Sequence, residues 1–203
     1  MAVAVEHEKR RKQILEKALT VFIDDGFEDA TFQKIADRCG ITRTILYLYF
    51  KNKREIFTYS IKQFLLNVEE NINAIRNNKS LDSPQKMKDV LLAIFSLLEE
   101  NRQLLFIVLD YLRYLSKNDI NPEERVRRRI VKLRHILSSI VIEGIKAGEL
   151  KKVSLKTTSD YFYNFIESAI FQLAILKRKD LIELKETVVF AVEQFTVIKQ
   201  TNI

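Results

Sequence analysis

A short helical stretch in the first quarter of the chain carries side chains that suit contact with DNA. Its predicted outer face holds two cations, two hydroxyl groups and one branched apolar group: Arg43, Thr44, Tyr47, Leu48 and Lys51. They share a face because their spacing follows the 3.6-residue period of a helix. Base edges present donors, acceptors and the thymine methyl group, while phosphates attract cations. The pattern predicts a helix that reads the DNA major groove.

The residues before this stretch indicate another helix and a turn. Ile35, Ala36 and Cys39 recur at helical spacing, and Gly40 supplies the left-handed conformation that ends a helix cheaply. Thr31 can cap this earlier helix, and Thr42 is a good N-cap for the reading helix. We expect the inner face of that helix to be apolar and buried, through Ile45, Leu46, Tyr49 and Phe50.

The start of the next helix carries charges of the unexpected sign. Asn52 can cap it, but Lys51, Lys53 and Arg54 surround a terminus whose dipole favours anions, and only Glu55 has the expected charge. Each exposed cation there costs about 0.3–1 kcal/mol unless an anion covers the free N–H groups. We interpret the cluster as a place for a DNA phosphate; the alternative is an ordinary solvated charged face.

Helical periodicity extends through nearly the whole chain and predicts an all-α fold of about nine helices. A helix-turn-helix DNA-binding domain is expected over residues 1–52 and a second helical domain over 53–203. Besides the reading helix after Thr42, the expected helices cover 8–25, 32–38, 53–77, 84–99, 103–116, 121–147, 154–177 and 180–199. Gly26 should stop the first helix, while Ser83 and Asp180 should cap two later ones.

Composition restricts the class of protein. The 203 residues are 47% hydrophobic, with a net charge of +7 and a pI near 9.4, which suits a nucleic-acid partner or a membrane surface. A single cysteine, Cys39, excludes an intrachain disulfide and is expected to be a core residue. The longest apolar run, residues 104–109, is far below the roughly 20 residues that cross a membrane. We expect a cytoplasmic protein.

The last two helices are apolar on more than one face. Such helices must be buried on several sides, so one side can pack on its own domain and another on a second subunit. The predicted four-helix dimer interface comprises Phe162, Ile166, Ala169, Leu173, Leu184, Val188, Val192 and Phe195. The alternative is that both helices are simply central core.

Residues 22–57 resemble the TetR family of bacterial transcription regulators. The shared pattern reads here as F-x3-GF, I-A-x2-C-G-I-T and L-Y-x-Y-F-x-N-K-x2-I-F. The resemblance implies a homodimer whose reading helices enter successive major grooves. It also implies DNA contacts at Gln33, Lys34, Thr42, Arg43, Thr44, Tyr47, Tyr49 and Lys53. The basic residues 9–12 are similar to family N-termini that touch the DNA backbone.

Three positions depart from the family pattern. Thr44 stands where glycine, alanine or proline is frequent, and Phe32 where a small hydroxyl residue is frequent. Leu48 replaces a polar or aromatic residue, and either contacts a thymine methyl or packs on its neighbours. The operator sequence therefore cannot be inherited from relatives.

The resemblance further implies a ligand-responsive regulator, most simply a repressor released from a palindromic operator by a small inducer. No metal or other cofactor is expected. Aromatic residues suggest an apolar or aromatic ligand, although each is more often plain core. The candidates are Phe95, Phe106, Tyr111, Tyr114, His135, Tyr161, Tyr163 and Phe171. The basic residues 125–134 could face an acidic ligand, but Glu123 and Glu124 favour a solvated, ion-paired face.

Two other classes of protein compete with this interpretation. An enzyme is disfavoured because the sequence offers no metal-ligand spacing, no glycine-rich phosphate loop and no nucleophile with a base. A basic helical module that binds a protein or a membrane surface remains as the alternative, and it would show no preferred DNA sequence.

Overall fold

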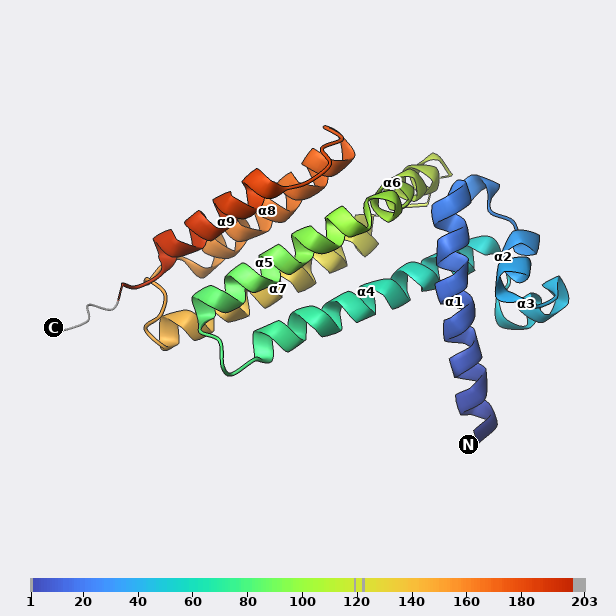
Figure 1. Cartoon of the computed structure of the whole chain (residues 1–203), viewed down its shortest axis with the longest axis horizontal. Coiled ribbons are helices and arrows are strands. Elements are labelled where there is room, and N and C mark those ends of the chain that lie inside the picture. The colour runs from blue at the N-terminus through green and yellow to red at the C-terminus, as the bar shows by residue number, and fades with distance from the viewer. Residues whose placement is uncertain (1, 119, 122, 199–203) are drawn as a thin grey trace. The chain divides into compact units, whose positions relative to one another are not determined.

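The computed structural model describes residues 2–118, 120–121 and 123–198, with the backbone alone at 2–4 and 125. Over these residues the fold is all α, as predicted, and contains nine helices (Figure 1). They are α1 (Ala2–Asp29), α2 (Phe32–Cys39), α3 (Arg43–Tyr49), α4 (Lys53–Asn77), α5 (Ser83–Glu100), α6 (Arg102–Lys117), α7 (Glu123–Lys146), α8 (Leu155–Ala174) and α9 (Ile182–Phe195).

The chain folds into two compact units. The head unit comprises the residues up to Glu70 together with Phe106–Tyr114, and the bundle unit comprises Asn71–Leu105 with the residues from Leu115 onward. The long helix α4 and the helix α6 each contribute residues to both units.

The core of the head unit is rich in aromatic side chains. Phe22, Phe27 and Phe57 lie within 6.0 Å of one another, measured between ring centroids. Tyr111 joins them from α6, with its ring centroid 4.5 Å from that of Phe57 and its hydroxyl 3.2 Å from Thr58. Such rings bury large apolar areas, so this cluster holds α1, α4 and part of α6 together as the support of α2 and α3.

Several helix ends differ from the sequence prediction. The first helix begins earlier than residue 8, and Gly26, at φ 81°, interrupts it without ending it, because helical structure resumes as far as Asp29. Asp82 rather than Ser83 caps α5 by accepting a hydrogen bond from the Gln85 N–H at 2.8 Å. The helix α9 begins only at Ile182, without a side-chain cap hydrogen bond.

The bundle unit packs α5, α7, α8 and α9 against one another, and α8 and α9 run side by side (Figure 1). Gly144 lets the side chains of Leu150 and Ser83 lie close to the backbone of α7. A Cβ atom at Gly144 would lie 2.6 Å from Leu150 Cδ1 and 2.8 Å from Ser83 Cβ. An isolated antiparallel bridge joins Leu150 to Thr196, so the loop after α7 is tied to the end of α9. No helix among the described residues is long and apolar enough to span a membrane.

Candidate nucleic-acid interface

Local sequence signals build the turn between α2 and α3 as predicted. Thr31 caps α2 by accepting from the Lys34 N–H at 3.2 Å, and Gly40 ends it in the left-handed conformation at φ 68°, ψ 36°. Thr42 then caps α3 by accepting from the Ile45 N–H at 3.3 Å. The helix-turn-helix is therefore fixed at both of its caps and at its glycine.

The predicted outer face of α3 is exposed. Arg43, Thr44, Tyr47 and Leu48 all lie at the surface, together with Lys51 just beyond the helix. Leu48 has 74% of its surface exposed, so it does not pack on its neighbours and is free to meet a thymine methyl group.

The inner face of α3 is narrower than predicted. Leu46 and Phe50 are buried, and Tyr49 is half-buried, but Ile45 is 39% exposed. The prediction for Ile45 was wrong because α3 is a short helix in which only Leu46 is buried. Ile45 consequently adds a branched apolar side chain to the outer surface.

A buried ring at the start of α2 supports the exposed face of α3. Phe32 is only 9% exposed, and its ring is stacked on that of Tyr47, with 4.5 Å between centroids and 22° between planes. Arg43, one turn earlier on α3, donates from Nη2 to the Tyr47 hydroxyl at 3.0 Å. Phe32 was recognised in the sequence only as a departure from the family pattern, because no local signal pairs it with Tyr47.

The N-terminal part of α1 also reaches α3. His7 stacks on Tyr49 with 4.6 Å between ring centroids. In the basic segment 9–12, the Arg11 guanidinium lies 4.3 Å from the ring centroid of Tyr59 and 5.1 Å from that of Phe50. Arg11 therefore braces the head by cation–π contact, whereas Lys9 and Lys12 are exposed.

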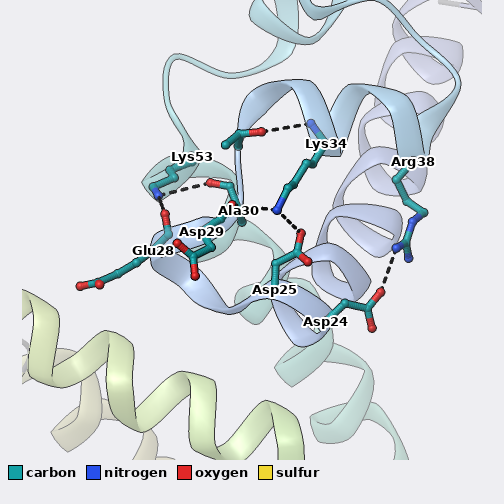
Figure 2. Close-up of polar contacts among 9 residues, drawn as sticks. Asp24, Asp25, Glu28, Asp29, Ala30, Lys34, Arg38 and Lys53 are labelled. Atoms are coloured by element: carbon teal, nitrogen blue, oxygen red, sulfur yellow. Dashed lines mark hydrogen bonds and ion pairs between the residues drawn. The ribbon is translucent and has the colours of Figure 1, made fainter.

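Two predicted DNA-contacting residues of α2 have partners within the head, and Figure 2 shows those of Lys34. Gln33 is exposed and donates from Nε2 to Asp37 Oδ1 at 2.7 Å. The Lys34 ammonium lies 3.2 Å from Asp25 Oδ2 and donates to the Asp29 carbonyl at 3.3 Å. Lys34 thus ties α2 to the end of α1, while half of its side-chain surface stays exposed.

Lys53, the first residue of α4, is half-buried and points back at the end of α1 (Figure 2). Its ammonium donates to the carbonyl oxygens of Glu28 and Ala30, at 2.5 and 3.2 Å, and lies 5.1 Å from the centroid of the Phe27 ring. Carbonyls at a helix end carry partial negative charge, so they attract the cation. The structure gives Lys53 an internal role that the sequence did not predict.

The start of α4 is capped as the sequence predicted. The Asn52 side chain accepts from the Glu55 N–H at 2.9 Å. The Glu55 carboxylate in turn reaches back and accepts from the Lys51 N–H at 2.6 Å. Lys51 and Arg54 remain exposed beside this terminus.

The lone cysteine is a core residue. Cys39 is buried, and its thiol donates a weak hydrogen bond to the Ile14 carbonyl at 3.9 Å. Burial raises the pKa of the Cys39 thiol, and nearby Lys17 and Arg10 offset this only in part. The thiol is therefore protonated at neutral pH, which is typical of a structural buried cysteine.

The predicted ligand residues are divided between the two units. Phe106, Tyr111 and Tyr114 belong to the head unit, whereas Phe95, His135, Tyr161, Tyr163 and Phe171 belong to the bundle unit. Tyr111 and Tyr114 pack on Phe27 as ordinary core rings, with centroid distances of 4.7 and 5.1 Å. His135 and Phe171 are exposed. Along the basic start of α7, Arg128 pairs with Glu124 at 2.8 Å, which fits the predicted solvated face.

The predicted dimer residues lie inside the chain's own bundle. Seven of them are at most 7% exposed: Phe162, Ile166, Ala169, Leu173, Leu184, Val188 and Val192. Phe195 is half-buried and packs on Tyr161 and Phe162. These side chains have almost no surface left for a second subunit, so this set is corrected to internal core. Periodicity found the apolar faces of α8 and α9 but could not tell which face is internal.

A capped helix-turn-helix with an exposed polar and cationic second helix defines a DNA-binding protein of the helix-turn-helix class. Residues 14–59 match the family model of the bacterial regulatory proteins of the tetR family. The uncharacterized HTH-type transcriptional regulator YfiR of Bacillus subtilis (strain 168) is 32% identical over 180 residues, which cover 83% of this chain and 82% of that protein. The chain belongs to the TetR family.

Solved structures agree with this assignment. A TetR transcription regulator from Haloarcula marismortui matches with a TM-score of 0.80 at 17% identity, covering 94% of this chain and all of that one. The transcriptional regulator FadR from Bacillus subtilis, in complex with stearoyl-CoA, matches with a TM-score of 0.62 at 25% identity, covering 89% of this chain and 96% of that one. The protein is thus a transcription regulator rather than an enzyme.

Proposed function

We propose that this regulator binds a palindromic DNA operator as a homodimer and acts as a repressor that a small molecule releases. The observation that carries the proposal is the outer face of α3, where Arg43, Tyr47 and Leu48 are exposed on a capped, supported helix. These groups match the acceptors and methyl groups of the major groove. A two-fold dimer would place two such helices roughly 34–36 Å apart, one turn of DNA.

The cations around the start of α4 have different proposed roles. Lys51 and Arg54 are exposed and are our candidates for contact with DNA phosphates. Lys53 was expected to bind a phosphate. In the structure, two of its ammonium N–H groups donate instead to the carbonyls of Glu28 and Ala30. Since an ammonium has three donors, Lys53 keeps one for a phosphate.

The proposed dimer surface is the exposed apolar surface of α8 and α9 and of the segment between them. Five of its residues are each more than half exposed: Phe171, Ile175, Leu176, Ile182 and Phe190. Each exposes apolar area that a monomer would leave in water. A second copy of the same surface would cover it and complete a four-helix interface.

The first ligand class to test is a fatty-acyl thioester. This choice is supported by the FadR structure, which was solved with stearoyl-CoA and matches this chain over 89% of its length. A long apolar chain also agrees with the apolar ligand that the sequence predicts. Coupling between two such sites is typically about 1–3 kcal/mol, or roughly 5- to 150-fold in DNA affinity.

Selection from random duplex DNA tests the operator proposal. The full-length protein should enrich an inverted repeat whose half-site centres are one helical turn, or a multiple of it, apart. Enrichment of DNA without any common sequence would favour the basic interaction module instead. Arg43→Ala should relax the preference at one position of each half-site, because base contacts carry specificity.

Titration with stearoyl-CoA tests the ligand proposal on the selected duplex. Release of DNA by the acyl thioester, but not by free CoA, is the expected result. Equal release by both compounds would indicate competition by a polyanion. Unchanged DNA binding with stearoyl-CoA would reject this ligand class and leave the operator proposal standing.

A further inference from the structure

Phe32 occupies an unusual place for a buried aromatic residue. It is the first residue of α2, directly after the cap Thr31, yet it is only 9% exposed. Its ring is stacked on that of Tyr47 on α3, at 4.5 Å between centroids and nearly parallel. Phe32 therefore contacts the reading helix directly as well as packing in the head.

Tyr47 receives support on its ring and makes a hydrogen bond through its hydroxyl. Almost half of its surface, 48%, is exposed on the outer face of α3. An exposed tyrosine would ordinarily sample several rotamers, but stacking on a buried ring favours one of them. Its hydroxyl then stands where Arg43 Nη2 donates to it at 3.0 Å.

The same contacts orient the Arg43 guanidinium, whose central carbon lies 5.5 Å from the Tyr47 ring centroid. Arginine has five N–H donors in a rigid planar fork, and the tyrosine hydroxyl uses one of them. The remaining donors match the paired acceptors O6 and N7 that guanine presents in the major groove. An oriented fork discriminates bases better than a mobile one, because less rotamer freedom is lost on binding.

We propose that Phe32 is a specificity-determining positioning residue, which acts through Tyr47 to orient Arg43 toward a guanine of the operator. The inference rests on the proposed sequence-specific DNA binding of this chain and adds a residue outside the reading helix to it. Phe32 itself touches no base. Its replacement should therefore change which sequence is preferred without changing the number of phosphate contacts.

Substitution of Phe32 by leucine and by tyrosine tests the inference. Phe32→Leu keeps a large apolar side chain but removes the ring, whereas Phe32→Tyr keeps the ring. Phe22→Leu is the matched control, because Phe22 is a buried head residue whose ring contacts are with Phe27 and Phe57. Each variant is titrated with the selected duplex and with duplexes changed at single base pairs, at several salt concentrations.

The expected result is a loss of discrimination at one position only. The wild-type protein should prefer its guanine by roughly 5- to 150-fold, the range of one good bidentate contact. Phe32→Leu should reduce that preference at least about fivefold, at the same position that Arg43→Ala relaxes. Phe32→Tyr and Phe22→Leu should keep the preference, and the salt dependence should be unchanged in all of them.

Two results would overturn the inference. One is an unchanged preference in a folded Phe32→Leu variant, and the other is an equal loss at every position of the site. If circular dichroism shows that Phe32→Leu does not fold, Tyr47→Phe is tested instead, because it keeps the ring and removes only the hydroxyl. A guanine preference that is retained in Tyr47→Phe rejects the link to Arg43. A wild-type protein that enriches no sequence would reject the proposed function together with the inference, whereas the first two results leave that function standing.

Discussion

Lys53 combines a position expected to meet DNA with contacts inside the head. Its ammonium is held by two carbonyl oxygens near the end of α1, and its charge lies over the Phe27 ring. Hydrogen bonds to charged groups stabilise proteins more than neutral ones do. Loss of this cation should therefore affect folding as well as DNA affinity.

We expect Lys53→Met to lower the free energy of unfolding by about 1–2 kcal/mol, which is at the lower end for charged hydrogen bonds because the site is partly exposed. Urea unfolding followed by circular dichroism measures this. Lys51→Met is the matched control: Lys51 is exposed, so its loss should leave stability unchanged and reduce the salt slope of DNA binding by about one. Equal stability of the two variants would contradict the internal role of Lys53.

Single residues were predictable from the sequence where their partners are close along the chain. The caps Thr31, Thr42 and Asn52 and the turn at Gly40 depend on residues three to four positions away, and local rules describe such contacts. The partners of Lys53 lie 23 and 25 residues away, and no local pattern indicates them.

At the scale of the elements, helix type and order were predictable because long apolar periodicity is a strong signal. The residues at which helices begin and end were harder to predict. Gly26 interrupts α1 without ending it, because one glycine permits a kink when the residues on both sides are held by packing. Asp82 replaced the expected Ser83 as the cap of α5, since either residue type can accept the N-terminal hydrogen bond.

Gly144 allows a prediction about the packing of α7. A Cβ atom at this position would come within 2.8 Å of Leu150 and Ser83 side-chain atoms, closer than van der Waals contact permits. Gly144→Ala should therefore destabilise the protein by about 1–3 kcal/mol, although alanine favours helix intrinsically. Thermal unfolding measures the loss.

Lys146→Ala is the control for Gly144→Ala, because Lys146 is exposed on the same helix. It should change the free energy of unfolding by less than about 0.5 kcal/mol. A Gly144→Ala variant as stable as this control would mean that the Leu150 side chain moves aside without loss of stability. The close contact at Gly144 would then not require glycine.

At the scale of the whole molecule, the sequence predicted a dimer interface from side chains that the chain buries within its own bundle. Phe162, Val188 and their neighbours are apolar, and they are also the residues that α8 and α9 bury against the rest of their own bundle. Hydropathy is similar for both kinds of apolar surface, so it could not separate them. Other apolar residues of this region, Ile175, Ile182 and Phe190, remain exposed and define the proposed dimer surface.

A double variant tests the proposed dimer surface. Ile175→Glu with Ile182→Glu places charges on side chains that are 63% and 59% exposed, which the isolated chain tolerates and an apolar interface does not. Sedimentation equilibrium should give twice the 23.9 kDa chain mass for the wild-type protein and the single mass for the variant.

Val131→Glu is the matched control for this double variant, since Val131 is 59% exposed on α7. It should remain dimeric. Dissociation by Val131→Glu, together with an intact Ile175→Glu, Ile182→Glu dimer, would move the interface away from α8 and α9.

The stack of Phe32 on Tyr47 has a consequence for the design of hybrid regulators. A chimera that receives only residues 43–49 would carry the tyrosine and the arginine but leave the supporting ring behind. The smallest transferable module of this head would then start at Thr31 and include all of α2. Exchanging recognition helices between relatives should accordingly transfer operator choice only when the first residue of α2 travels with them.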